Sequence, residues 1–80
     1  MSLQAVSAMQ QKELQVKIGK QITKLRKQKK LSQVDFAYML DKDKQNINRL
    51  EKGKTNVTIG TLNQIAKLLE VPFQKLFDWD

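Results

Sequence analysis

The sequence of 80 residues contains no cysteine and no histidine. The first absence excludes disulfides and thiolate metal sites. The second removes the residue that most often acts as a general base and as a metal ligand. Only one proline and three glycines interrupt the chain, so it has neither a linker-like segment nor a glycine-rich phosphate loop. We therefore expect one domain, no metal or other cofactor, no small-molecule ligand and no enzyme activity.

Long apolar runs are also missing. No run is long enough to span a bilayer. The first residues, MSLQAVSAMQQKE, lack the basic start and the long apolar stretch of a secretion signal. We therefore expect an intracellular protein.

The positive charge is concentrated in one half of the chain. The formal net charge is +7, and residues 17–54 hold twelve bases and four acids, whereas residues 55–80 hold two bases and three acids. Such an asymmetry favours a polyanionic partner, either nucleic acid or an anionic membrane surface. Charge alone leaves a lysine-rich solvated surface open as the alternative.

The spacing of apolar residues predicts five short helices and no strand. The first carries Leu14, Ile18, Ile22 and Leu25 and ends near Lys29. N-cap residues are expected to start the next three helices, Gly53 to close the third in a left-handed turn, and a proline to lie in the first turn of the fifth. The three caps and the proline are Ser32, Asp43, Thr58 and Pro72.

The apolar residues of helices two to five give the expected core. Its inward-facing members are Phe36, Ala37, Leu40, Ile47, Leu50, Ile59, Leu62, Ile65, Ala66, Leu69, Phe73, Leu76 and Phe77. Tyr38 and Met39 are interpreted as core or rim packing. We place the domain at residues 14–78 and treat residues 1–13 as an N-terminal extension that either continues the first helix or is disordered.

The predicted third helix has an unusual outer face. At 100° per residue, an arc of about 140° collects only cations and amides. These are Lys44, Gln45, Asn48, Arg49 and Lys52. Asn is a weak helix former, so helix propensity does not explain Asn48. Amide and guanidinium groups match the donor and acceptor patterns that base pairs present in the DNA major groove.

Residues 31–53, LSQVDFAYMLDKDKQNINRLEKG, resemble the Cro/lambda-repressor-like (Xre-type) helix-turn-helix family. That family has the signature L-S-Q-x-x-L-A, a turn, and I-S-x-x-E-x-G. The matching residues are Leu31, Ser32, Gln33, Ala37, Ile47, Glu51 and Gly53. Residues 18–30 resemble the family's first helix, and residues 61–77 resemble its fourth and fifth.

Three residues depart from the family pattern. Asp41 and Glu70 stand where the family often has Gly, and Lys42 replaces an apolar turn residue. Asp tolerates the left-handed conformation better than most residues, so we expect the turn at Asp41 to form.

The resemblance implies an all-α, compact five-helix domain with the helix-turn-helix at helices 2 and 3. It implies a sequence-specific regulator of transcription, of the repressor type, that binds double-stranded DNA with helix 3 in the major groove. Such a protein would be cytoplasmic, prokaryotic or phage-encoded, and associated with the nucleoid. Members of the family usually bind DNA as homodimers. The residues expected at the dimer surface here are Phe73, Phe77 and Trp79, and the N-terminal extension is the alternative.

The same resemblance assigns roles to individual residues. Base reading maps onto Lys44, Gln45 and Arg49, and Asn48 is a fourth candidate because it shares their face. Arg26 and Glu51 match a family salt bridge between helices 1 and 3. Gln33 carries a phosphate contact by resemblance. The other phosphate candidates flank the reading face and are Lys42, Asn46, Lys52, Lys54, Thr55 and Asn56.

Two alternative functions stay open at this point. The first is the antitoxin of a toxin–antitoxin pair, with a toxin as partner protein, or a phage or restriction-control repressor. The second is a basic protein-interaction or membrane-surface module that uses the first helix. The lysines of residues 17–30 are spread around that helix rather than opposite an apolar stripe, which argues against membrane binding.

Overall fold

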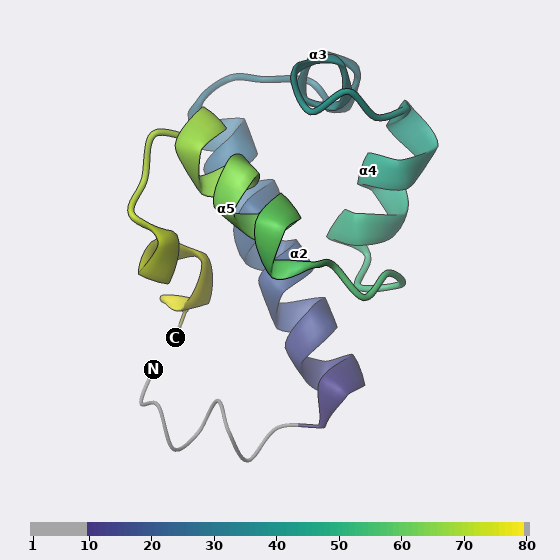
Figure 1. Cartoon of the computed structure of the whole chain (residues 1–80), viewed down its shortest axis with the longest axis vertical. Coiled ribbons are helices and arrows are strands. Elements are labelled where there is room, and N and C mark those ends of the chain that lie inside the picture. The colour runs from purple at the N-terminus through teal and green to yellow at the C-terminus, as the bar shows by residue number, and fades with distance from the viewer. Residues whose placement is uncertain (1–9, 80) are drawn as a thin grey trace.

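The structure is a computed structural model that describes residues 10–79 (Figure 1). Over this range the chain forms α2 (Gln11–Gln28), α3 (Gln33–Met39), α4 (Lys44–Glu51), α5 (Ile59–Leu68) and the 3-10 helix η1 (Phe73–Phe77). No strand occurs among these residues, so the predicted all-α fold is confirmed. None of the described helices is both long and apolar enough to cross a membrane. Of the expected N-terminal extension, residues 1–9 lie outside the described range, and residues 11–13 belong to α2.

The prediction of a fifth α-helix is wrong in its detail. The last element is a 3-10 helix of five residues, and Pro72 precedes it as the N-cap instead of lying in its first turn. Within this segment the N–H of Lys75 donates to the carbonyl of Pro72 at 2.9 Å, which is a 3-10 bond. A segment of five residues can form few of the hydrogen bonds between residues four apart that define an α-helix.

The three predicted N-caps are confirmed. Ser32, Asp43 and Thr58 each accept a hydrogen bond from the backbone N–H three residues further on. The donor–acceptor distances are 3.0, 2.7 and 3.1 Å, respectively. Each bond satisfies an N–H that the helix leaves without an internal partner.

The four α-helices of the described chain end in the same Schellman arrangement. In α4, for example, the N–H of Lys54 donates to the carbonyl of Arg49 at 2.9 Å and that of Gly53 donates to Leu50 at 3.1 Å. The residue after each C-cap has a positive φ, and these residues are Lys30, Asp41, Gly53 and Glu70, with φ of 59°, 57°, 75° and 58°. The left-handed turns expected at Gly53 and Asp41 therefore form, and those at Lys30 and Glu70 were not predicted.

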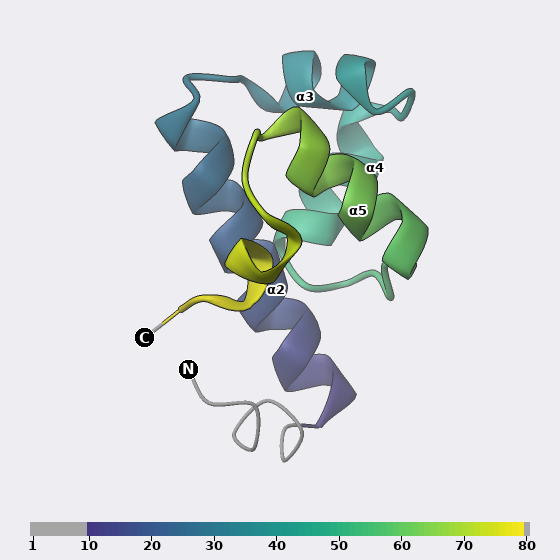
Figure 2. The same cartoon turned by 60° about the vertical axis from the view of Figure 1, so that its left-hand side comes forward.

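The core lies where α2, α3, α4, α5 and η1 meet (Figure 2). Phe36, Ile22, Ile47, Ile65, Leu69 and Leu76 are its largest fully buried side chains. Two expectations are wrong, because Ile59 is 77% exposed and Tyr38 is 86% exposed. Ile59 is the first residue of α5, and Val57, just before the cap, packs against the core instead. Tyr38 lies on the side of α3 opposite Phe36 and Leu40, and Met39 beside it is 43% exposed.

Candidate nucleic-acid interface

Two glycine contacts fix α4 on α2. A Cβ added at Gly19 would lie 2.6 Å from the carbonyl oxygens of Leu50 and Glu51, and one at Gly53 would lie 2.6 Å from the Cα of Val16. The backbones therefore approach more closely at these positions than any side chain would allow. The Gln15 side chain also donates to the Gly53 carbonyl at 3.1 Å. Sequence reasoning missed the contact at Gly19, although a glycine inside a predicted helix is itself unusual.

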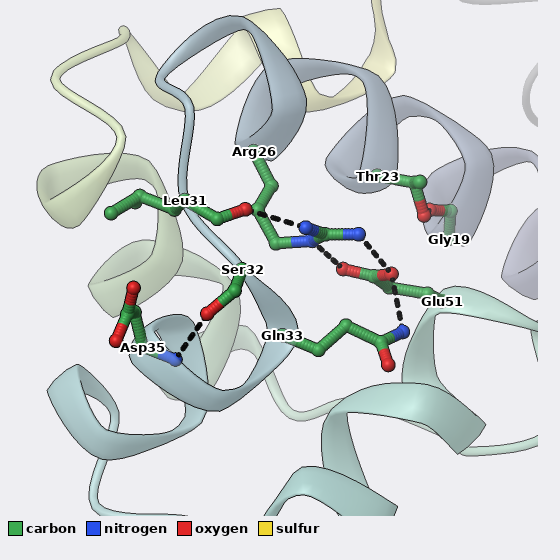
Figure 3. A network of polar contacts seen from close by, with 8 residues as sticks. All are labelled: Gly19, Thr23, Arg26, Leu31, Ser32, Gln33, Asp35 and Glu51. Atoms are coloured by element: carbon green, nitrogen blue, oxygen red, sulfur yellow. Dashed lines mark hydrogen bonds and ion pairs between the residues drawn. The ribbon is translucent and has the colours of Figure 1, made fainter.

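A buried ion pair connects the helices that carry the site (Figure 3). Arg26 donates from Nε to Glu51 Oε2 at 2.6 Å and from Nη2 to Glu51 Oε1 at 3.1 Å. The two side chains are only 8% and 5% exposed. This is the pair that the family resemblance implied between the first and third helices, here α2 and α4.

Two further hydrogen bonds extend this pair into a network. Arg26 Nη1 donates to the carbonyl of Leu31 at 2.6 Å, and Gln33 Nε2 donates to Glu51 Oε1 at 2.9 Å. Because Gln33 is the first residue of α3, the network joins α2, the start of α3 and the end of α4. It places the Gln33 amide next to the last turn of α4.

The outer face of α4 carries the four predicted base-reading residues together. Lys44, Gln45 and Arg49 are exposed, Asn48 is half-buried, and the four line one shallow open hollow. Among residues 10–79, no acidic side chain lines this hollow. The opposite face of α4 buries Ile47 and Leu50 in the core. The arrangement offers amide, ammonium and guanidinium groups along one surface.

The predicted phosphate-contact residues border this face. Lys42 lies in the turn before α4, Asn46 lies in its first turn, and Lys52 is its C-cap. Lys54, Thr55 and Asn56 follow in the connection to α5. The lysines and Asn56 are exposed, whereas Gln33, Asn46 and Thr55 are half-buried. Asn46 differs from the rest because its Oδ1 accepts a hydrogen bond from Arg49 Nη2 at 2.6 Å.

The aromatic residues expected at a dimer surface lie at the other end of the molecule. Phe73, Phe77 and Trp79 are half-buried and pack against the core. Their rings follow one another, with centroid distances of 5.7 Å and 6.2 Å. Gln21 of α2 holds this segment by donating to the carbonyls of Lys75 and Asp78 at 2.8 and 3.1 Å. In Figure 1 this C-terminal segment and α4 lie on opposite sides of α2.

Comparisons with known proteins agree with this architecture. The helix-turn-helix family HTH_3 matches residues 22–76. The control protein C.MunI from Mycoplasma sp is 35% identical over 66 residues, which cover 81% of this chain and 89% of that protein. The crystal structure of the restriction-modification controller protein C.AhdI from Aeromonas hydrophila has a TM-score of 0.80 and 28% identity, over 86% of this chain and 100% of the other.

A second solved structure has the same fold within a longer protein. An HTH_3 family transcriptional regulator from Vibrio cholerae matches with a TM-score of 0.77 and 31% identity, over 85% of this chain and 38% of the other. The match over residues 22–76 covers both helices of the predicted helix-turn-helix, α3 and α4. The chain therefore belongs to the helix-turn-helix family HTH_3 and is a DNA-binding transcriptional regulator.

Proposed function

We propose that this chain controls the transcription of a restriction–modification system by occupying a specific operator as a repressor. The similarity to the restriction-modification controller protein C.AhdI supports restriction control, and the similarity to the control protein C.MunI supports a regulatory role. The similarity extends over more than four-fifths of this chain in both cases. We therefore favour restriction control over the antitoxin and over the membrane-surface module.

The face of α4 that lacks acidic residues is the observation that carries the proposed mode of binding. Arg49 is suited to donate to O6 and N7 of a guanine, and Gln45 and Asn48 are suited to pair with N6 and N7 of an adenine. Lys44, at the start of the helix, can reach a guanine. With α4 in the major groove, the polar ends of these four side chains would read the base pairs.

The phosphate contacts would hold α4 in register without reading sequence. Gln33 has two amide hydrogens, and Glu51 accepts one of them. The second remains available to donate to a phosphate oxygen beside the end of α4. The other proposed phosphate contacts are Lys42, Asn46, Lys52, Lys54, Thr55 and Asn56.

We further propose that the chain binds DNA as a homodimer through Phe73, Phe77 and Trp79. This aromatic cluster lies away from α4, so one chain could use both surfaces at once. Two copies of α4 would then meet two half-sites about one helical turn apart. Selection of bound duplexes from a random pool tests this symmetry, because it should return two related half-sites.

The decisive experiment compares Arg49→Ala with Lys54→Ala on the selected duplex and on scrambled duplexes at a fixed salt concentration. Arg49→Ala should remove the preference at one base pair, worth about 1–3 kcal/mol. Lys54→Ala should weaken all duplexes alike and reduce the slope of log affinity against log salt by about 1. Lys67→Ala, an exposed lysine of α5, is the matched control. Equal effects of Arg49→Ala and Lys54→Ala on every duplex would refute the division between reading and positioning.

A further inference from the structure

Arg49 is not free on the surface of α4, because its Nη2 donates to Asn46 Oδ1 at 2.6 Å. We propose that Asn46 is a positioning residue that presents the Arg49 guanidinium to a guanine and so sets the strength of the preference for that base pair. The inference rests on the proposed function. It assigns Asn46 a sequence-dependent role, which differs from a phosphate contact.

Asn46 is well placed to orient a neighbour. It lies three residues before Arg49, so the two side chains are adjacent on the helix surface. Its own N–H donates to the capping carboxylate of Asp43 at 2.7 Å, which ties the Asn46 backbone into the first turn of α4. Asn46 is half-buried, whereas Arg49 is exposed. The backbone of Asn46 is thus held in the first turn of α4, and its side chain accepts a hydrogen bond from a guanidinium that would otherwise sample many rotamers.

The chemistry of the two groups identifies the atom that makes this contact. A guanidinium has only donors, so the amide atom facing it must be the oxygen of Asn46. A phosphate has only acceptors and could meet only the amide nitrogen. The oxygen that accepts from Arg49 is therefore not the atom that would contact a phosphate.

The bond to Asn46 leaves Arg49 able to read a base. It uses one of the N–H groups of Arg49, and among residues 10–79 it is the one hydrogen bond that the Arg49 side chain makes. The remaining N–H groups suffice for two parallel bonds to guanine O6 and N7. A side chain that is already oriented loses less conformational freedom on binding, which favours the matched duplex.

The test uses the full chain and the selected duplex, with the guanine read by Arg49 replaced by each other base. Asn46→Ala retains the backbone N–H that caps α4 but loses the acceptor. It should reduce discrimination at this base pair by on the order of 2- to 12-fold, the effect of one hydrogen bond, and leave the preferences at other positions unchanged. In an Arg49→Ala background, Asn46→Ala should change discrimination no further.

Asn46→Asp separates positioning from phosphate binding. It keeps an oxygen acceptor for Arg49, so discrimination at the guanine should persist, while the added negative charge weakens the binding of every duplex. Asn63→Ala removes an exposed amide of α5 and is the control. It should change neither the discrimination at the guanine nor the affinity for any duplex.

Several outcomes would overturn the inference. Asn46→Ala could weaken all duplexes equally with discrimination intact, which would make Asn46 a phosphate contact only. Loss of discrimination in Asn46→Asp to the same extent as in Asn46→Ala would show that the acceptor oxygen does not matter. If the unmodified chain binds all duplexes alike, the proposed function fails before any variant is compared.

Discussion

Replacing Glu51 with Ala removes the centre of the polar network in Figure 3. Of its bonds to the described residues, Arg26 then keeps only the one to the Leu31 carbonyl, while its guanidinium stays in a position where the side chain is 8% exposed. Gln33 loses the acceptor for its amide. The variant therefore leaves a buried charge without its counter-ion and frees a residue that we expect to contact DNA.

The expected cost follows from this burial. Removing one partner of a buried ion pair destabilises a protein by about 3–5 kcal/mol. A domain of this size has a total stability of about 4–12 kcal/mol. Because 1 kcal/mol shifts the midpoint of a small domain by about 4–8 °C, the melting temperature should fall by about 12–40 °C.

The exposed pair of Lys29 and Glu70 provides a matched control. It has a distance of 2.9 Å, but its side chains are 39% and 76% exposed. Lys29→Ala should therefore cost only about 0–1 kcal/mol. Urea unfolding followed by circular dichroism measures both variants. A cost for Glu51→Ala no larger than that for Lys29→Ala would refute the assignment of the buried pair to the stability of the fold.

The double replacement Arg26→Met with Glu51→Leu extends the same test. Apolar residues in place of both charges remove the uncompensated guanidinium, so the double variant should be more stable than Glu51→Ala alone. Recovery should be incomplete, because the Leu31 carbonyl and the Gln33 amide lose their partners.

The remaining predictions concern three backbone positions, each measured by its urea midpoint. Gly19→Ala should cost about 1–3 kcal/mol and weaken operator binding, because its Cβ would meet the α4 backbone at 2.6 Å. Gly60→Ala should instead stabilise by about 0.5–1 kcal/mol, since the atom nearest to its Cβ is 3.9 Å away. A Gly19→Ala variant more stable than Gly60→Ala would contradict the close packing of α4 on α2. Asp41→Gly should stabilise by up to about 1 kcal/mol, because a left-handed residue with a Cβ is strained. A lower midpoint for Asp41→Gly would show that its side chain stabilises the turn.

Local patterns predicted the helices and their ends well. Ser32, Asp43 and Thr58 act within four residues of the chain, so their capping bonds can be inferred from spacing alone. The expectation for Ile59 is wrong because helical periodicity does not show whether the first residue of a helix already faces the core. Val57, outside the periodic stretch, takes the inward place.

The candidate site also combines features that a local sequence pattern predicts with contacts that it does not. The proposed reading face lies on the single helix α4, so its four residues could be grouped from their spacing in the sequence. The bond between Asn46 and Arg49 spans three residues and was also within reach of a spacing argument. The contact of Gln15 with Gly53 joins residues 38 apart in the chain, and no local pattern contains it. Tyr38 was expected to pack in or beside the core but is exposed. The residues around an aromatic side chain in the sequence do not show whether it is buried or exposed.

The eight residues of α4 are too few to form a stable helix alone, so their geometry must come from packing. That packing uses Ile47, Leu50 and Glu51, together with Gly53 just beyond the helix. The proposed reading residues occupy four of the five other positions of α4, and none of them belongs to the buried core. Under the proposed function, a substitution at Gln45 or Arg49 changes the operator preference without altering the contacts that hold α4 on α2.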